Sequence, residues 1–178
     1  MSGWRPAVPP IEGHLLRNST RNILPVMCSR GQEQSLPPTT ASSSFMELKI
    51  TEQVLAGLMA HSREAAPYEA CGYLAERNGV VLQMFPLTNI DQASDHFTMD
   101  PVEQFQAVRE MREQGLKLRA VYHSHPETPA RPSAEDIRHA ADPHISYLII
   151  SLLAGVDPVR SFRIQQGIVE EEIVRPVA

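Results

Sequence analysis

The residues whose types and spacing could do chemistry lie close together, in the stretch AVYHSHPETPARPSAED at positions 120–136. His123 and His125 are two apart at the end of an expected strand, so their side chains point to the same face. Asp136 follows in the first turn of an expected helix. Two imidazole nitrogens and one carboxylate oxygen make three ligands, and zinc with three protein ligands keeps a position for water, as in catalytic sites. The stretch therefore predicts a catalytic zinc site of His123, His125 and Asp136.

Two further side chains could complete such a site as a base and an oxyanion donor. Zinc lowers the pKa of a water that it binds to about 7, and a carboxylate can speed the transfer of the proton. The candidate base is Glu69, in PYEACGYL directly before an expected strand. Ser133, three residues before Asp136, could donate a hydrogen bond to the oxyanion that forms when water attacks a carbonyl group. These residue types favour hydrolysis of an amide-type bond.

The same residues also have purely structural interpretations. Ser133 and Asp136 fit a capping box at the start of a helix. That motif explains both residues without a metal, but it does not explain the two histidines that precede a proline-rich loop. The two interpretations can hold together. Taken alone, Glu69 also fits a solvated acid in front of a strand.

Other reactive residue types are interpreted more simply. Cys71 has no activating neighbour in the sequence, so we expect a small, buried hydrophobic side chain. His139, three residues after Asp136, is a candidate to hydrogen-bond a metal ligand. The acidic run at 170–172 is expected to be the solvated face of a hairpin, and His61 is expected on a helix surface.

The elements that must position these residues follow from hydrophobic periodicity and from turn signals. Thr51 and Asp100 are expected N-caps, and Asn78-Gly79 signals a tight hairpin turn. Strands are expected at 47–50, 71–76, 80–87, 118–124, 147–153, 159–165 and 168–174, and helices at 52–66, at 101–114 and from 134. The expected buried face of the second helix consists of Val102, Phe105, Val108 and Met111. The mixture predicts an α/β domain with a mainly antiparallel or mixed sheet flanked by helices.

A compositional boundary lies near Met46. Residues 1–45 hold six prolines and end in a low-complexity run rich in serine and threonine. Such a segment buries too little apolar surface to offset its ordering entropy. We expect residues 1–45 to be a disordered extension and residues 46–178 to be the folded domain. Met46 opens a strand-like start and could be the initiator, so we hypothesise that the extension is not part of the natural product.

Length, charge and cysteine content narrow the class of protein. The 178 residues suit one domain, and the formal charge of −5 divides into +2 for residues 1–45 and −7 for the remainder. An acidic domain disfavours nucleic acids and membrane surfaces as partners. Two cysteines without a CxxC pair indicate a reducing, cytoplasmic location. The sequence contains no apolar run near the ~20 residues that span a bilayer, so we expect no membrane segment.

Three parts of the sequence together resemble a known family. His123-Ser124-His125-Pro126, followed by Pro132-Ser133 and by Asp136, fits the pattern H-x-H-x7-S-x2-D of the JAMM (MPN+) zinc metalloproteases. The segment EACGYL, which begins at Glu69, is similar to the glutamate element of small prokaryotic members. The resemblance covers residues 46–178 and is to the small, Mec-like isopeptidase branch.

The resemblance implies a single-domain JAMM/MPN fold, which is a curved mixed β-sheet flanked by helices and similar to that of cytidine deaminase. It implies one zinc ion per chain, held by His123, His125 and Asp136. Glu69 would be the general base, and Ser133 would stabilise the oxyanion. Family members cleave peptide or isopeptide bonds after the C-terminal glycine of ubiquitin-like proteins. Small prokaryotic relatives act on ubiquitin-like sulfur carriers, releasing a conjugated protein or a terminal cysteine, so we expect the C-terminal tail of such a carrier as substrate.

Alternative functions stay open at this point. Many MPN relatives have lost the metal and serve as scaffolds, so a non-catalytic module that binds a ubiquitin-like tail is one alternative. A RadC-like protein associated with DNA repair is another, because such proteins carry a similar His-x-His-Pro segment. The intact ligand set counts against the first, and the acidic domain counts against the second. A nucleobase deaminase fits less well, since the sequence has no P-C-x-x-C element.

Overall fold

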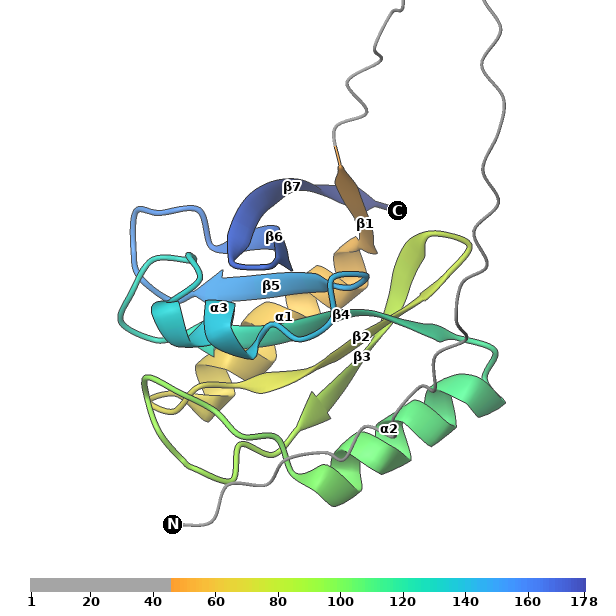
Figure 1. The fold of residues 1–178 in the computed structure, drawn as a ribbon, viewed down its shortest axis with the longest axis horizontal. Coiled ribbons are helices and arrows are strands. Elements are labelled where there is room, and N and C mark those ends of the chain that lie inside the picture. Colours follow the sequence, from red (N-terminus) through yellow and green to blue (C-terminus); the bar gives the residue numbers. More distant parts are fainter. Residues whose placement is uncertain (1–45) are drawn as a thin grey trace, which may run out of the picture. The chain divides into compact units, whose positions relative to one another are not determined.

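The computed structural model describes residues 46–178, and Figure 1 shows their arrangement. The expectations for residues 1–45 lie outside this described part. Every expected strand and helix is present, with ends that differ from the expected ones by a few residues. In the described residues the elements follow one another as β1 (Glu47–Thr51), α1 (Glu52–Ala65), β2 (Cys71–Arg77), β3 (Val80–Leu87), α2 (Pro101–Glu113), β4 (Lys117–His125), α3 (Ala134–His139), β5 (Ser146–Ser151), β6 (Val159–Gln165) and β7 (Ile168–Val177).

One mixed sheet holds these strands, in the order β1-β3-β2-β4-β5-β6-β7. β1 pairs in parallel with β7 along Glu47–Thr51 and also with β3 at Lys49 and Ile50, so the sheet closes into a barrel. β4 and β5 are parallel neighbours, whereas β2 is antiparallel to both β3 and β4. The expected curved mixed sheet is therefore confirmed, and its closure is an additional finding.

Helix α1 packs against one face of the sheet. Its N-cap Thr51 accepts a hydrogen bond from the Val54 amide at 3.4 Å, as expected from the sequence. His61 was expected on the helix surface, but it is half-buried because its Nδ1 atom lies 2.9 Å from the Tyr122 hydroxyl. The core on this side consists of Leu48, Ile50, Val54, Leu58, Leu74, Val81, Ala120, Tyr122, Leu148 and Ile150.

Helix α2 covers the other face of the sheet (Figure 1). On β4, Ala120 and Tyr122 belong to the α1 core, whereas Val121 packs on the α2 core. Because side chains alternate along a strand, His123 and His125 share the face of Val121. The α2 core consists of Cys71, Ala75, Phe85, Leu87, Met99, Ala107, Met111 and Leu116.

The prediction of which α2 residues are buried is wrong for the first turns of the helix. Met111 is buried, but Val102 is 64% exposed and Phe105 is 72% exposed. The helix is turned so that Gln104 faces the sheet, where it accepts a hydrogen bond from the Tyr73 hydroxyl at 2.7 Å. The Gln104 side chain also donates to the carbonyl oxygen of Met99 at 2.9 Å. These polar contacts, together with a buried alanine in the next turn, outweigh the apolar pattern.

The expectation of a solvated acidic face at 170–172 is also wrong for one residue. Glu172 is 2% exposed, because alternation along β7 turns it inward while Glu171 points outward. Its carboxylate accepts hydrogen bonds from Arg119 at 2.7 Å, from Ser161 at 2.9 Å and from Ser146. Three consecutive acidic residues cannot all point to the same face of a strand. Glu172 is the one that points inward, and it is paired with the Arg119 guanidinium.

Within residues 46–178, none of the helices is both long enough and apolar enough to cross a membrane.

Candidate metal centre

The two histidines lie at the carboxyl end of β4, between its neighbours β2 and β5. Both imidazoles are buried, and their Nε2 atoms are 3.0 Å apart. Ser124 points to the opposite side, where its Oγ accepts a hydrogen bond from the Ala70 amide at 2.8 Å. The expectation that His123 and His125 share a face is therefore confirmed.

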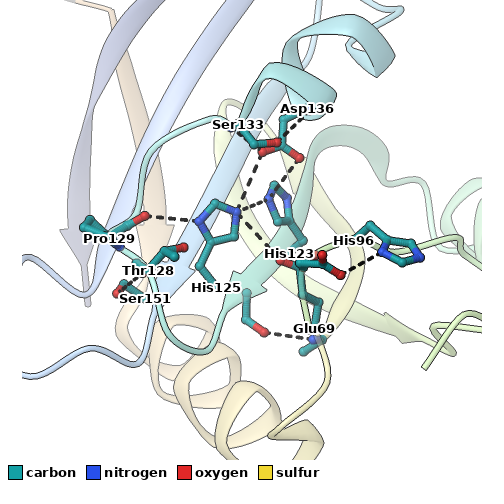
Figure 2. Close-up of polar contacts among 12 residues, drawn as sticks. Glu69, His96, His123, His125, Thr128, Pro129, Ser133, Asp136 and Ser151 are labelled. Carbon is teal, nitrogen blue, oxygen red and sulfur yellow. Dashed lines mark hydrogen bonds and ion pairs between the residues drawn. The ribbon is translucent and has the colours of Figure 1, made fainter. Parts of the chain in front are cut away.

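Asp136 reaches the same place from the first turn of α3. One carboxylate oxygen lies 3.3 Å from His123 Nε2, and the other lies 3.7 Å from His125 Nε2. Figure 2 shows the three side chains pointing toward one another. The capping box is present as well, because Ser133 Oγ accepts from the Asp136 amide at 3.0 Å and the Asp136 carboxylate accepts from the Ser133 amide at 2.7 Å. The structural and the metal-binding interpretations thus hold together.

The spacing of these donor atoms fits a zinc ion. All three ligand atoms lie within 4.8 Å of one another. Zn–N bonds of about 2.0–2.1 Å at tetrahedral angles place neighbouring donors roughly 3.3 Å apart, close to the separations seen here. The Nδ1 atom of His125 lies 3.1 Å from the carbonyl oxygen of Pro129 and donates to it in this arrangement. The lone pair of the neutral ring is then on Nε2, which faces the other two ligands.

The local environment also sets the charges of the ligands. Burial opposes ionisation of Asp136, but the adjacent imidazoles of His123 and His125 outweigh it and hold the pKa of Asp136 well below its usual range. Burial lowers the pKa of His123. Burial also disfavours the charged form of His125, yet the nearby Asp136 carboxylate and the hydrogen bond to the Pro129 carbonyl oxygen raise its pKa. Since a proton and a metal compete for the same nitrogen, metal affinity should fall as the pH falls.

Glu69 lies directly before β2 and next to the ligand cluster. Its side chain has an Oε1 atom 3.8 Å from His125 Nε2. The residue is only 4% exposed, so the alternative of a solvated acid does not hold. Burial raises the pKa of Glu69 to about 7; the nearby His125 opposes this shift and Asp136 adds to it. A carboxyl group that exchanges its proton near neutral pH is suited to general acid and base chemistry.

Ser133 shares a cavity of about 460 Å³ with His123 and Asp136. Its hydroxyl oxygen is occupied by the Asp136 amide, but its proton stays free to donate toward the cavity. His139 lines the same cavity. Hydrogen bonds from His139 to the ligands are absent from the described part of the chain, so its expected link to a ligand finds no support.

Cys71 is confirmed as a small hydrophobic residue. It is fully buried in the α2 core, and burial raises the pKa of its thiol to about 12. Its Sγ atom lies 3.5 Å from the carbonyl oxygen of Leu87, to which the thiol donates. A thiol with so high a pKa is a poor nucleophile at neutral pH.

Several residues that shape the site were missed from the sequence. The Phe97 ring stacks on His123, with centroids 4.8 Å apart and planes at 28°. The Asn89 side chain donates to the carbonyl oxygen of Glu69 at 3.1 Å. Ser124 and Pro129 support Ala70 and His125, as described above. Phe97, Asn89 and Ser124 act over long sequence separations, where sequence spacing carries no signal. Pro129 is only four residues from His125, but it acts through its backbone carbonyl group, which residue type does not reveal.

The fold and the site agree with the family that the chain matches. Residues 51–165 fit the family model Prok-JAB, described as prokaryotic homologs of the JAB domain. The match covers well over half of the chain, and the chain belongs to this family. The resemblance to JAMM (MPN+) proteins is therefore confirmed.

Two curated relatives are similar over most of their length. The chain is 34% identical over 136 residues to the CysO-cysteine peptidase of Mycobacterium tuberculosis, which covers 73% of this chain and 91% of that protein. It is 34% identical over 121 residues to the probable TtuB-protein conjugate cleaving protease of Thermus thermophilus, covering 67% and 78% respectively.

Solved structures show the same architecture. A protein from Desulfitobacterium hafniense is 46% identical with a TM-score of 0.67, and the match covers 72% of this chain and 92% of that one. A JAB1/MPN domain protein from Archaeoglobus fulgidus is 20% identical with a TM-score of 0.53, covering 74% and 98%. The second similarity shows a common fold.

Proposed function

We propose that the chain is a zinc-dependent hydrolase of peptide or isopeptide bonds. Its substrate would be a ubiquitin-like sulfur-carrier protein, cleaved after the C-terminal glycine to release a conjugated protein or a terminal cysteine. The observation that carries the proposal is the convergence of His123, His125 and Asp136, with the buried Glu69 carboxylate 3.8 Å from His125. The two curated relatives are named for cleaving a CysO-cysteine bond and TtuB-protein conjugates.

His123, His125 and Asp136 would hold one zinc ion per chain. When bound, zinc supplies a Lewis acid that polarises a carbonyl group and lowers the pKa of water. Asp136 brings a negative charge that offsets part of the charge of such an ion, and the carbonyl oxygen of Pro129 keeps the His125 ring in the tautomer that exposes Nε2.

Glu69 and Ser133 would move the proton and stabilise the developing charge. As a water molecule attacks the scissile carbonyl carbon, Glu69 accepts one proton from it. The Ser133 hydroxyl donates a hydrogen bond to the carbonyl oxygen while that oxygen becomes an oxyanion. When the C–N bond breaks, Glu69 returns its proton to the leaving nitrogen. The chain needs no covalent intermediate for this sequence.

The alternatives are less well supported. A tail-binding scaffold has no need of a buried carboxyl with a raised pKa beside the ligands, and Glu69 is such a group. A DNA-repair role conflicts with the net charge of −7 on residues 46–178. We also retain the cytoplasmic location as a proposal, because the cysteine content favours a reducing compartment.

The experiment that tests the function uses sulfur-carrier proteins extended beyond their terminal Gly-Gly by cysteine or by a linked protein. The zinc-loaded chain is incubated with each carrier, with and without a chelator, and the products are weighed by intact mass spectrometry. Without chelator, we expect the masses of carriers that end at Gly-Gly. The chelator should abolish the reaction, and added zinc should restore it. Carriers left intact by a chain that holds one zinc would contradict the proposal.

A further inference from the structure

The loop between β3 and α2, residues 88–99, contacts both the candidate base Glu69 and the candidate metal ligand His123. Its entry is fixed on α2, because the Thr88 amide and hydroxyl donate to the Glu103 carboxylate at 2.6 and 2.9 Å. Its exit returns to the same point, where the Asp100 amide donates to the carbonyl oxygen of Thr88 at 3.0 Å. The two ends of the loop are therefore held together by hydrogen bonds that do not involve residues 89–99.

Asn89 organises the interior of this loop with a single side chain. Its Nδ2 group donates to the carbonyl oxygens of Glu69 at 3.1 Å and of His96 at 3.2 Å. Its Oδ1 atom accepts from the amides of Asp91 at 3.1 Å and of Thr98 at 3.2 Å. A side-chain amide has two donor hydrogens and two acceptor lone pairs. The Asn89 amide uses all four, and one of the four leaves the loop to reach Glu69.

The same loop holds Glu69 from its other side and also touches a ligand. The Glu69 amide donates to the carbonyl oxygen of Ala93 at 2.8 Å. Phe97 lies between His96 and Thr98, two residues whose backbone groups are hydrogen-bonded to the Asn89 side chain. The Phe97 ring stacks on the His123 ring. Both peptide groups of Glu69 and one metal-ligand ring thus depend on a loop shape that Asn89 maintains.

We propose that Asn89 is a positioning residue that sets the place of the Glu69 carboxylate relative to the ligand cluster. The proposal rests on the proposed role of Glu69 as the base. The four hydrogen bonds of the Asn89 side chain all go to backbone groups, so it acts on Glu69 through the backbone and the loop. Proton transfer is sensitive to such placement, since a misplacement of about 1 Å can cost roughly 100-fold in rate.

The decisive variant is Asn89→Asp, which keeps the shape of the side chain and its acceptor oxygen. It replaces the donor group by an oxygen that faces the carbonyl oxygens of Glu69 and His96. We expect kcat to fall at least ~10-fold, with KM changed less than ~3-fold and zinc held at one ion per chain. Thr88→Val is the matched control. It removes one hydrogen bond of the same loop, but not one to Glu69, and should leave kcat near that of the parent.

A double-mutant cycle separates positioning from general damage. If Asn89 acts through Glu69, Asn89→Asp lowers kcat in the parent protein but adds little in a Glu69→Gln background. An equal loss in both backgrounds would overturn the proposal.

A second measurement does not depend on activity. Amide hydrogen exchange should be faster at Glu69 and across residues 90–98 in Asn89→Asp, and unchanged at these positions in Thr88→Val. Should Asn89→Asp not fold, Asn89→Ser serves in its place with the same expected results. Unchanged exchange together with unchanged kcat would contradict the role of Asn89. A parent protein that hydrolyses nothing would instead contradict the proposed function and leave the exchange result to be judged separately.

Discussion

Glu69 and Glu172 are the two buried glutamates of residues 46–178, and their surroundings are opposite. Glu172 on β7 is in contact with the Arg119 guanidinium and with two serine hydroxyls, so burial is outweighed and its pKa is lowered. The Glu69 carboxylate instead lies 3.8 Å from Nε2 of His125, an imidazole that carries a charge only when it is protonated. Burial then dominates and raises its pKa to about 7.

This difference in surroundings distinguishes a carboxylate that stabilises the fold, Glu172, from one suited to proton transfer, Glu69. A buried charge that is fully paired stabilises one arrangement of the fold, and removing its partner leaves an uncompensated charge. A buried carboxyl without a permanent cation can gain or lose a proton at neutral pH at little cost. Only the second kind lies beside the convergent side chains of His123, His125 and Asp136, which we propose as metal ligands.

The largest expected effect comes from Glu69→Gln, which keeps the shape of the side chain and removes its basicity. We expect kcat to fall about 10²–10⁴-fold, as for loss of a general base, while zinc content stays at one ion per chain. Steady-state kinetics and elemental analysis measure both quantities. Glu172→Gln is the matched control and should change kcat less than ~3-fold at a temperature where the variant is folded. Equal losses in the two variants would remove the distinction between the two glutamates.

Ser133→Ala should have the next largest effect. Loss of one oxyanion donor typically costs about 10²–10³-fold in kcat, and loss of the helix cap costs about 1 kcal/mol of stability. Ser133→Thr keeps both the hydroxyl and the cap, so its kcat and Tm should stay close to those of the parent. If alanine lowers Tm but leaves kcat unchanged, Ser133 is a cap residue alone.

The structural half of the comparison is tested by neighbouring residues on β7. Glu172→Gln leaves Arg119 without its buried partner, so we expect a loss of about 3 kcal/mol in the free energy of unfolding. Glu171 pairs with Arg160 at the surface, and Glu171→Gln should cost about 0–1 kcal/mol. Urea unfolding of both variants gives the two values. Similar losses would mean that the burial of Glu172 has no energetic consequence.

The smallest effect is a pH dependence of stability that Glu172 contributes. Its pKa in the folded state is lowered, so its contribution is complete above the unfolded value of about 4.3. The contribution is then lost as the pH falls through the folded-state pKa. The difference in unfolding free energy between the parent and Glu172→Gln should therefore shrink below about pH 4. A difference that is constant from pH 7 to the acid range would contradict this.

Much of the site could be predicted from the sequence because its residues are fixed by short-range geometry. Two histidines on one strand face and an acid in the next helix turn need only local spacing. The roles proposed for Glu69 and Ser133 follow from their residue types and from the family pattern. The role of Asn89 could not be predicted, since its contact with Glu69 joins residues on either side of a hairpin.

For the fold, too, local features could be predicted from the sequence and long-range contacts could not. Periodicity located the elements but not what packs on them, so the inward face of α2 and the burial of Glu172 were predicted wrongly. Glu172 is neutralised by Arg119, which lies 53 residues earlier in the chain, and periodicity carries no information on such pairs. Closure of the barrel by β1 pairing with β7 joins the two ends of the described domain, which no local pattern reveals.

The central claim is that His123, His125 and Asp136 form one zinc site. The most direct measurement is the zinc content of the purified chain beside that of Asp136→Asn, which keeps an oxygen able to cap α3 but loses the ligand charge. The account predicts one zinc per parent chain, and loss of tight binding in a variant that still folds. A folded parent that binds no zinc, or an Asp136→Asn protein that binds it equally well, would contradict the account.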